Sequence, residues 1–595
     1  MITLKPHKAR FITFYETGSP QVPELSDRSN VDIGSLKPEY PLPLRRRDIK
    51  IALRTGDIYW FAGNGGVARY DENAGNDYDR VMFFSAKRDL QSGDVTAISA
   101  SENEIWVKNA AGVSHIELKS LTVREHSELL FAETTKILDR HGMISERKLI
   151  RPSDLSEWDK FNTSDNDGGF TAAFCIGALC RYAVLKREGA AAEELEKAKA
   201  SAVRALEACI LMFYISGRDD GFPARSYITT DAPQPKGGLW LKKEGRTAVA
   251  LDTSLCREYG IVGDVYDTPD GIPARFAKLY RDDGYTDDDI IFKTDTSSDE
   301  ATLHFINFWY AHKILAEDDP ELDSYAVHCA AAMLDHIIKN GYEFRAMHGG
   351  STTWAKWSKR YFAGGLGWGD APLNATEVLM YCRVVGDMTG DPRWDEEYKK
   401  LVADGYADIS PLRGDRVWAQ SFAEGVDIPE DIMYGDHMLA TWSVYGLLMT
   451  ETDSELRAKY LKFLHDWRDR DVERQHNPMY DVPYLIINGK CPDPDFKNEE
   501  GIAHGLNAWY SRHNVSMLAS GTGVFDRYDV PMKIYRAGYR ETGFLLNPEE
   551  RFISKYDRNA RQYTHEDSGG TMYVESCTAY TTSYWLGLYH GVLQD

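Results

Sequence analysis

The chain has 595 residues, of which 43% are hydrophobic, and its formal net charge is −23. So acidic a protein argues against nucleic acid and anionic membranes as partners, because both are recognised through clustered positive charge. No apolar run approaches the roughly 18 residues needed to span a bilayer, and the eight scattered cysteines, none in CxxC spacing, predict buried free thiols.

Residues 1–45 are rich in proline and irregular, as in SPQVPELSDRSN and KPEYPLPLRRR. A proline-rich, irregular composition is typical of loops rather than of helices or central strands. We therefore predict an extended N-terminal arm that wraps on the body of the protein.

A short self-similarity follows this arm. The stretch GDIYWFAGNGGVARYD matches NEIWVKNAAGVSHIE, and Trp60 aligns with Trp106 at a constant offset of 46 residues. Both copies have a strand–turn–strand pattern, and this period is typical of propeller blades. Because two copies cannot close a propeller, we predict a small β module over 46–120 with two blade-like units, acting as a structural element or a lid.

Helix-length segments with apolar residues at i, i+3 and i+4 recur over residues 121–595. They come in pairs joined alternately by tight turns and by long, polar loops rich in glycine and aromatic residues. A toroid of helical hairpins requires this alternation, because short turns close one rim and long loops carry function at the other. The predicted fold is mainly α, an (α/α) barrel of six or seven hairpins that forms the catalytic domain. An α-solenoid is the alternative, although no fixed repeat length is visible.

Two early loops of the barrel carry candidate residues. In TSDNDGGFTAAF, Asp165 and Asp167 precede a helix, so capping of its free amides is the simple interpretation. DNDG is also similar to a calcium loop, but Phe174 stands where an EF-hand needs a carboxylate, which leaves only a simpler calcium site open. In DDGFPARSYIT, a rigid turn presents Arg225 and Tyr227.

The stretch TDTSSDE, residues 294–300, places seven polar residues before an aromatic helix. A capping arrangement accounts for one or two of them, which leaves Asp295, Asp299 and Glu300 as functional candidates. His304 follows Glu300 by four residues and shares its helix face. It fits a buried core histidine and a catalytic one equally well.

A fourth loop, residues 347–374, is too long, polar and aromatic to be only a connector. It alternates tryptophans with cations, which suits stacking on a sugar ring together with binding of a carboxylate. Its candidates are His348, Trp354, Lys356, Trp357, Arg360 and Trp368. Later segments add Asp436, His437, Tyr510, Arg512, His513, Asn514 and Glu575.

The motifs DNDG, GFPARS, DTSSDE and TTWAKW, in this order, resemble a group of carbohydrate-linked bacterial proteins. In that group, repeats of the two-component-regulator-propeller type precede an α-helical toroid. The resemblance covers roughly residues 50–590. The architecture is more broadly similar to (α/α)-barrel polysaccharide lyases and glycoside hydrolases, which implies carbohydrate metabolism but does not fix the reaction.

The favoured reaction is β-elimination on a uronic-acid-containing glycan, the reaction of a polysaccharide lyase. It requires neutralisation of the uronate carboxylate, a base for the C5 proton and an acid for the leaving oxygen. The toroidal lyases that the chain resembles meet these needs with Arg, Asn, His and Tyr. The predicted catalytic residues are His304, Tyr227, Tyr510, His513, Asp299 and Glu300. The predicted substrate-binding residues are Arg225, Asp167, Asp295, His348, Trp354, Lys356, Trp357, Arg360, Trp368, Asp436, His437, Arg512, Asn514 and Glu575.

Two alternatives stay open. A glycoside hydrolase needs a pair of carboxylates, and the chain offers Asp167, Asp295, Asp299, Glu300, Asp370, Asp436 and Glu575. A non-catalytic glycan-binding protein is the second alternative. Arg225, Lys356 or Arg512 on the floor of the cleft would favour a uronate, and a cleft of carboxylates and tryptophans would favour hydrolysis.

The functional loops are expected to converge on one cleft at one end of the toroid. These loops are 165–168, 221–227, 294–304, 348–370, 434–437 and 510–514. The expected partner is a polysaccharide or oligosaccharide, without nucleic acid, membrane or cofactor, although Ca²⁺ is left open. MITLKPHKARFITFYETG lacks an apolar signal segment, which predicts a cytoplasmic protein, or a periplasmic or secreted one whose signal has been removed. Nothing in the sequence predicts the oligomeric state.

Overall fold

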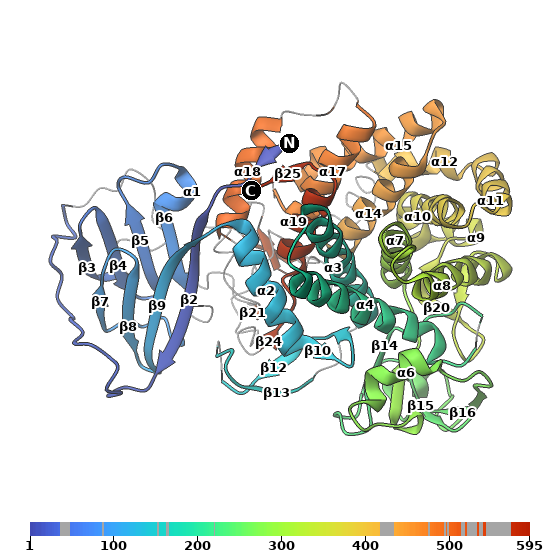
Figure 1. The fold of residues 1–595 in the computed structure, drawn as a ribbon, viewed down its shortest axis with the longest axis horizontal. Helices are drawn as coiled ribbons and strands as arrows, with labels where there is room; N and C mark the ends of the chain where they lie inside the picture. Colours follow the sequence, from blue (N-terminus) through green and yellow to red (C-terminus); the bar gives the residue numbers. More distant parts are fainter. Residues whose placement is uncertain are drawn as a thin grey trace.

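The computed structural model describes most of the chain as an N-terminal β module and a larger helical body (Figure 1). The described residues are 1–35, 48–85, 89–151, 154–161, 166–218, 220–413, 415–416, 434–473, 476–492, 496, 499–512, 518–519, 532–534, 540–542 and 573–595.

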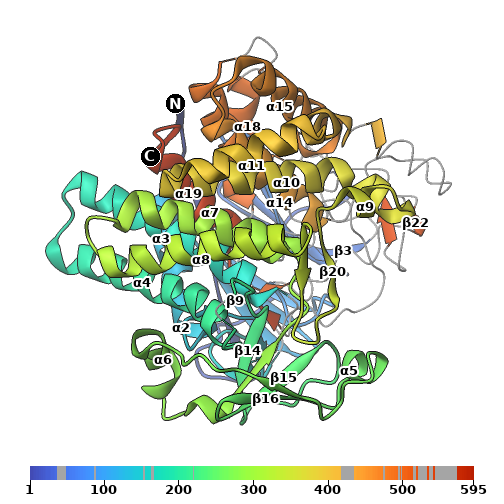
Figure 2. The same ribbon diagram turned by 90° about the vertical axis from the view of Figure 1, so that its right-hand side faces the viewer.

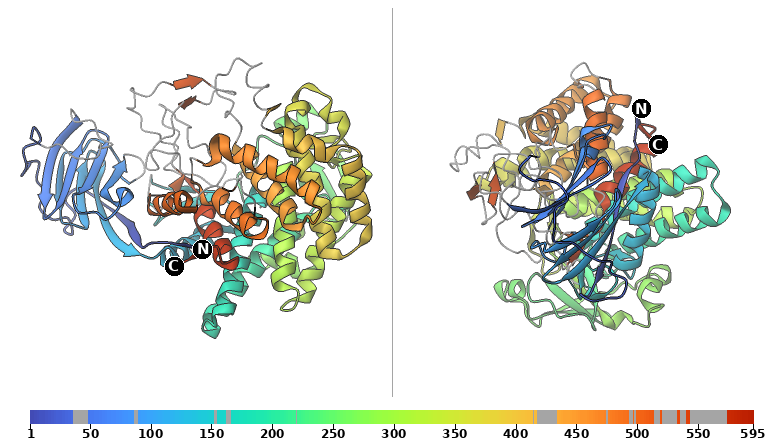
Figure 3. Two further views of the ribbon diagram at one scale, coloured as in Figure 1. Left: turned by 90° about the horizontal axis from the view of Figure 1, so that it is seen from above. Right: turned by 90° about the vertical axis from the view of Figure 1, so that its left-hand side faces the viewer.

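The β module consists of two four-stranded antiparallel sheets that share one core. The first contains, in order, β3 (Ile49–Thr55), β4 (Ile58–Gly63), β5 (Gly66–Asp71) and β6 (Val81–Ser85). The second contains β2 (His7–Tyr15), β9 (Gly112–Leu121), β8 (Glu104–Asn109) and β7 (Ala97–Ala100). Figure 3 shows the module, in blue, to one side of the helical body.

The predicted N-terminal arm is in part a strand. β2 pairs along its whole length with β9, from His7 opposite Leu121 to Tyr15 opposite Val113. It covers the edge of β9 that β8 leaves open, and an exposed edge of this length would invite pairing with other chains. β1 (Ile2–Thr3) pairs in parallel with β25 (Leu593–Gln594), so the two ends of the chain lie together. The second sheet thus begins well before residue 46, and residues 36–47 lie outside the described part.

The two matched tryptophans of the self-similar stretches point to different faces. Trp60 is fully buried between the sheets, in the core that also holds Ile105 and Val107. Trp106 lies between these two residues on β8, so it faces the opposite side. There its ring stacks on His115 with centroids 3.9 Å apart. A shift of one residue along a strand moves a side chain to the other face of the sheet. The two tryptophans therefore do not occupy equivalent positions, and the blade-like relationship stays a prediction.

Within the described residues, six helices form an inner ring. They are α3 (Asp167–Glu188), α7 (Ser298–Leu315), α10 (Gly365–Thr389), α14 (Tyr434–Thr450), α17 (Pro478–Lys490) and α19 (Thr578–Tyr589). Each packs against the next, and α19 packs against α3, which closes the ring. In the described chain, α3 alone has the length and composition of a membrane-spanning helix, but 94% of its apolar stretch is buried inside the protein.

Outer helices cover the ring. They are α4 (Ala192–Tyr214), α8 (Pro320–Lys339), α11 (Pro392–Ala403), α15 (Ser454–Trp467) and α18 (Glu499–Arg512), each packed on the inner helix before it. α2 (Val123–Leu138) covers α19. The described part of the chain therefore forms an (α/α) barrel of six helix pairs, the smaller predicted number. Figure 2 shows three pairs, α3–α4, α7–α8 and α10–α11, side by side.

Burial explains which helices take the inner positions. α19 is buried from Thr578 to Leu588, so it has no solvent-facing side. α15 instead buries one stripe, from Tyr460 to Trp467, and exposes polar residues between. A helix that is buried all round fits only inside the ring, and an amphipathic one fits its outside.

The two rims of the barrel differ in their connections. Short turns join α3 to α4, α7 to α8, α10 to α11 and α14 to α15 at one rim. At the opposite rim, longer connections lead from an outer helix to the next inner one. All six inner helices of the described chain begin at this second rim, so the positive ends of their dipoles face the long loops.

One long connection, between α4 and α7, holds a sheet that the sequence did not predict. Its strand order is β14 (Ser226–Thr229), β18 (Ile290–Lys293), β15 (Trp240–Glu244), β16 (Thr247–Ala250) and β17 (Val265–Asp267), all antiparallel. α5 (Ser254–Glu258) and α6 (Ala274–Arg281) belong to the same insertion. The next connection, between α8 and α10, holds the hairpin of β19 (Glu343–Arg345) and β20 (Ser351–Lys356).

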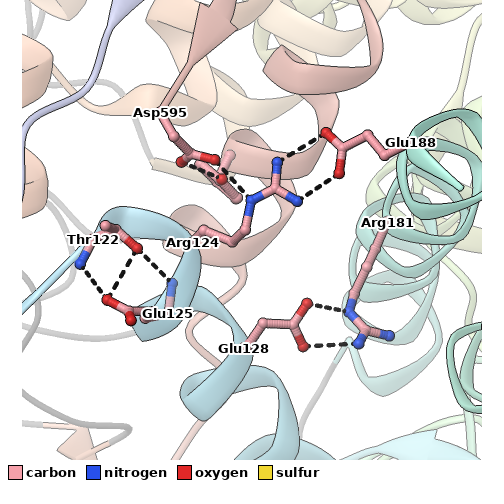
Figure 4. A network of polar contacts seen from close by, with 8 residues as sticks. Thr122, Arg124, Glu125, Glu128, Arg181, Glu188 and Asp595 are labelled. Atoms are coloured by element: carbon pink, nitrogen blue, oxygen red, sulfur yellow. Dashed lines mark hydrogen bonds and ion pairs between the residues drawn. The ribbon is translucent and has the colours of Figure 1, made fainter. Parts of the chain in front are cut away.

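Polar contacts join α2 to the barrel (Figure 4). Arg124 donates to both oxygens of Glu188, at the end of α3, at 2.7 and 2.9 Å, and to Asp595 at 2.7 Å. Arg181 binds Glu128 with a similar two-point contact at 2.7 and 2.8 Å. These pairs fix the sixth outer helix against the ring and hold the last residue of the chain in place.

Candidate functional site

Carboxylates gather at the rim where the inner helices begin. They are Asp167 on α3, Asp299 on α7, Asp370 on α10, Asp436 on α14, Asp481 on α17 and Glu575 just before α19. An acid is favourable here because the helix dipole is positive at this end. Helix capping alone would explain why acids lie here. We therefore use the exposure of each carboxylate, and whether it pairs with a cation, to separate structural acids from functional ones.

Three of these acids are buried. Asp167 is fully buried and pairs with Arg140 at 3.1 Å. Asp481 is fully buried and pairs with Arg468 at 2.7 Å. Glu575 is 5% exposed. Asp167 and Glu575, both predicted to bind substrate, therefore lie within the protein and not on a surface that a glycan could reach.

Asp299, Asp370 and Asp436 remain partly exposed, and they come from three consecutive helices of the ring. The pKa of Asp436 is raised to about 6, chiefly by burial. Arg413, whose Nη2 lies 3.1 Å from the carboxylate, opposes this shift, and the charges of Asp370 and Asp299 add to it. A partly exposed carboxyl group with a pKa raised in this way has the property of a general acid.

An exposed tryptophan stands beside these carboxylates. Trp368 is 41% exposed in the first turn of α10. Arg416 donates from Nη1 to its carbonyl oxygen at 2.9 Å, and the guanidinium lies 5.0 Å from the ring centroid. Tyr361 donates its hydroxyl proton to Asp370 at 2.7 Å. The site thus combines an accessible aromatic ring with accessible acids.

Glu377 lies further along α10 and supports the site from within. It is fully buried, and it accepts hydrogen bonds from Trp357 Nε1 at 2.7 Å and from Thr302 Oγ1 at 3.3 Å. Burial, with the charges of Asp299 and Asp436, raises its pKa to about 8, so it is protonated at neutral pH. Trp357, predicted to stack on sugar, is fully buried and serves to orient this acid.

Arg225 connects three loops instead of facing a ligand. It is 8% exposed, and it donates from Nε to Asn166 Oδ1 and from Nη1 to the carbonyl oxygen of Asp295, both at 3.1 Å. Asn166 in turn donates to Asp299 at 3.3 Å. Arg225 therefore positions Asp299 through Asn166 and has little surface left for a uronate.

Asp295 has a strained backbone and a structural contact. Its φ is +67°, in the left-handed region that non-glycine residues adopt only at a cost of about 1–3 kcal/mol. Its carboxylate accepts hydrogen bonds from the backbone N–H and the hydroxyl of Thr353, both at 2.9 Å. These bonds join the start of α7 to the β19–β20 hairpin.

Glu300 and His304 are neighbours, as their spacing predicted, and both are fully buried. Phe213 and Phe308 lie on two sides of the imidazole, with ring centroids 5.4 and 5.7 Å away. Burial lowers the pKa of His304 to about 3, so the ring is neutral at ordinary pH. His304 is thus a core histidine in this structure and not a base that reaches a substrate.

Three more predicted residues are buried. The hydroxyl of Tyr227 donates to the carbonyl oxygen of His141 at 2.7 Å, and the side chain is fully buried. Tyr510, on the outer helix α18, is 1% exposed, as is His437. Of the aromatic and imidazole groups favoured for elimination, Tyr227, His304 and Tyr510 therefore lie in the core, where they take part in packing.

The β19–β20 region keeps most of its predicted residues accessible. Trp354 and Arg360 are exposed, and His348 and Lys356 are partly exposed. For Arg512 only the backbone is described, and His513 and Asn514 lie outside the described residues.

Several residues of the site escaped the sequence analysis. Asn166 and Thr353 lie inside two of the predicted functional loops, but their uncharged side chains carry no signal that distinguishes them from other polar loop residues. Arg413 and Glu377 carry no local signal, because their roles depend on contacts with distant segments. The calcium ion stays a prediction: no group of three His, Cys, Asp or Glu in the described chain could hold a metal, and Asp165 lies outside it.

No family model matches the chain, and no curated protein matches it. Among solved structures, the cellulase Cel9M of C. cellulolyticum is similar with 8% identity and a TM-score of 0.35, over 78% of this chain and 98% of that one. A Bacteroides ovatus GH9 structure is similar with 8% identity and a TM-score of 0.35, over 90% of this chain and 96% of that one. At these values the likeness does not establish a shared family.

Proposed function

We propose that this protein is a glycoside hydrolase, with Asp436 as general acid and Asp299 as general base on a polysaccharide or oligosaccharide. The observation that carries the proposal is the pattern of exposure at the long-loop rim. Asp299, Asp370 and Asp436 are accessible beside the exposed ring of Trp368, while three other acids of this rim are buried. Two accessible carboxylates with different environments are the requirement for hydrolysis of a glycosidic bond.

The roles follow from the surroundings of each acid. Asp436 has its pKa raised to about 6, so it holds a proton in mildly acidic solution. Asp299 accepts a hydrogen bond from Asn166 at 3.3 Å, which orients one of its oxygens. We therefore assign Asp436, whose pKa is raised, as the acid and Asp299 as the base.

The reaction needs two proton transfers. Asp436 gives its proton to the glycosidic oxygen as the bond from this oxygen to the anomeric carbon breaks. Asp299 takes a proton from a water molecule whose oxygen forms the new bond to the anomeric carbon. The products are two sugars with free hydroxyl groups, and exchange with solvent returns Asp436 to its acid form and Asp299 to its carboxylate form.

Hydrolysis has more support than elimination. Elimination needs an accessible base and a cation for the uronate, but Tyr227 and His304 are fully buried and Arg225 is 8% exposed with its donors engaged. Two of the predicted cations stay accessible: Arg360 is exposed, and Lys356 is partly exposed with its ammonium group 5.8 Å from the ring centroid of Tyr361. With three accessible carboxylates at the rim, the balance of charge still favours a neutral glycan over a polyanionic one.

The test is incubation with neutral and uronate-bearing glycans, read by new reducing ends and by ultraviolet absorbance of an unsaturated uronate. We expect reducing ends without that absorbance, and near-complete loss of activity in Asp436→Asn and Asp299→Asn. Glu193→Gln, a change at an exposed residue of α4 that pairs with Lys197, is the matched control and keeps activity. Unsaturated products would establish elimination instead. Binding without cleavage of any glycan would favour a glycan-binding protein.

A further inference from the structure

Two buried histidines lie where the β module joins the barrel. The chain enters the module from β1 through residues 5–6, and it returns to the barrel through Thr122, between β9 and α2. These two connections adjoin, because His7 at the start of β2 lies opposite Leu121 at the end of β9. His7 directly follows the first connection, and His126 lies one helical turn after the second. We call His7 and His126 the histidine pair.

The two rings of the pair contact each other directly. His7 Nε2 and His126 Nδ1 are 3.0 Å apart, and the hydroxyl of Tyr580 on α19 lies 3.3 Å from the same nitrogen of His7. His7 is 3% exposed and His126 is 6% exposed. The histidine pair therefore joins β2 of the module to α2 and α19 of the barrel, beside both connections between the two parts.

The geometry limits how many protons the pair can hold. Of the two facing nitrogens, 3.0 Å apart, one donates a proton and the other accepts it, so the neutral pair has one hydrogen bond. A first added proton binds the outer nitrogen of the donor ring and leaves this bond in place. A second added proton puts an N–H group on both facing nitrogens, which breaks the bond and brings two positive rings together in a buried site.

The surroundings of the pair favour its neutral form. Burial lowers the pKa of His7 to about 4, against the opposing charge of Asp79. Burial also lowers the pKa of His126 to about 3, and the charge of His7 adds to this shift. Asp79 lies on α1 (Asp77–Arg80) of the module. On the barrel side, burial raises the pKa of Tyr580 well above its ordinary value, so that its hydroxyl is uncharged.

The outer helix α18 also packs on β2 at this place. The ring centroid of its Tyr510 lies 4.8 Å from that of Tyr580, and burial raises the pKa of Tyr510 well above its ordinary value. Ser511 donates to the carboxylate of Asp79 at 2.9 Å, which gives the module a second polar contact with the barrel. His504, a third histidine near this contact, is exposed. Asp79 is thus the acid of the described chain that favours a charged pair.

We propose that the histidine pair is an acid-sensitive joint, which fixes the β module on the barrel and releases it when both rings are protonated. The proposal concerns the arrangement of the two parts of the chain and does not depend on the proposed function. Release exposes both rings to solvent, where a histidine binds a proton near its ordinary pKa of 6.5. Because the attached state binds these protons only at lower pH, acid favours release. The ratio of released to attached protein should rise by up to about tenfold per pH unit for each histidine.

The test is small-angle X-ray scattering of the full-length protein as pH falls from 6.5 to about 4, with helical circular dichroism recorded on the same samples. We expect the radius of gyration of the parent to increase, and to return when the pH is restored, while the helical signal stays constant. The double variant His7→Gln with His126→Gln has two amides that can bond to each other and do not titrate. Its radius of gyration should stay constant over the whole range.

His312→Gln is the matched control and should respond to acid as the parent does, because His312 is partly exposed on α7 and pairs with Asp323 at 2.9 Å. The single variants His7→Gln and His126→Gln repeat the test if the double variant does not fold. Each keeps one titrating ring, so release should depend about half as steeply on pH. A constant radius in the parent, an equal increase in the double variant, or an increase that accompanies loss of helix would each overturn the joint.

Discussion

Glu300 and His304 lie one turn apart on α7, fully buried, with Glu300 Oε2 3.8 Å from His304 Nε2. Within the described part of the chain, neither ring nitrogen of His304 has a hydrogen-bond partner. Burial raises the pKa of Glu300 well above its ordinary range and lowers that of His304 to about 3. Burial therefore favours the protonated form of Glu300 and the neutral form of the His304 imidazole. A buried polar pair of this kind makes the folded state sensitive to pH in two opposite directions.

The first prediction concerns Glu300→Gln. Because the folded-state pKa of Glu300 is raised, the folded protein holds a proton that the unfolded chain has lost above its ordinary value of 4.5. The free energy of unfolding of the native protein therefore falls as pH rises, by up to about 1.4 kcal/mol per pH unit from this residue. Glutamine resembles the protonated acid and does not titrate. Urea unfolding at several pH values should show the variant gaining stability relative to the parent as pH rises, and parallel curves would contradict a protonated Glu300.

His304→Gln is expected to act on the acid side. The folded-state pKa of His304 is lowered from 6.5 to about 3, so in this range the unfolded chain binds a proton that the folded protein does not. The parent protein should lose stability as pH falls from 6.5 towards 3, and the variant should lose less. Thermal unfolding across this range tests the prediction. His312→Gln is the matched control, because His312 is partly exposed and pairs with Asp323 at 2.9 Å. A variant as sensitive to acid as the parent would mean that His304 is protonated in the folded state.

Arg413 tunes the proposed acid. Its charge opposes the raised pKa of Asp436, from 3.1 Å away. The native enzyme should lose kcat/KM as pH rises through about 6, because Asp436 then gives up its proton. Arg413→Gln removes the opposing charge, so the decrease of kcat/KM with pH should occur at higher pH. Arg413→Lys keeps the charge and should leave the pH of this decrease nearly unchanged. A decrease that does not move in the glutamine variant would exclude Asp436 as the group that titrates.

Gly168 makes room for the Glu300 carboxyl group at the start of α3. A Cβ at Gly168 would lie 2.5 Å from Glu300 Oε2 and 3.2 Å from the carbonyl oxygen of Arg225. Gly168→Ala should therefore destabilise the fold by about 1–3 kcal/mol through overpacking. Gly501→Ala is the matched control, because a Cβ there meets nothing within 4 Å in α18. That change should be neutral or stabilising by up to about 1 kcal/mol. Equal effects in denaturant unfolding would contradict the close contact.

The Arg124 contacts of Figure 4 predict a modest stabilisation of the barrel closure. Arg124 is 29% exposed at the side chain and binds both Glu188 and Asp595. Arg124→Ala should lower the free energy of unfolding by about 1 kcal/mol, since partly exposed ion pairs are weak but two-point contacts of arginine are stronger than most. Lys197→Ala removes an exposed pair with Glu193 and should have no measurable effect. A midpoint of unfolding that is unchanged in both variants would leave Arg124 without a role in stability.

The sequence by itself determined the barrel. Apolar spacing at i, i+3 and i+4 and the alternation of short and long connections are local properties, and they predicted a toroid of helix pairs with its long loops at one rim. They also predicted that Glu300 and His304 share a helix face. They did not predict the strand β2, which ends at Tyr15, before the proline-rich segment begins. A strand at a sheet edge is recognised by its partner, and the partner of β2 is β9, which lies far along the chain.

Only the tertiary structure decided which candidate residues a ligand can reach. Asp299 and Glu300 are adjacent in sequence, yet one is partly exposed and the other fully buried, because successive residues of a helix point in directions about 100° apart. Composition and spacing cannot say which of these directions faces the neighbouring helix α3 and which faces the rim. Likewise, Tyr259 acquires its place only when the inserted sheet meets the β19–β20 hairpin and its ring stacks on His348. The sequence thus determines the pattern of helices, and packing between distant segments selects the accessible acids and rings from a larger set.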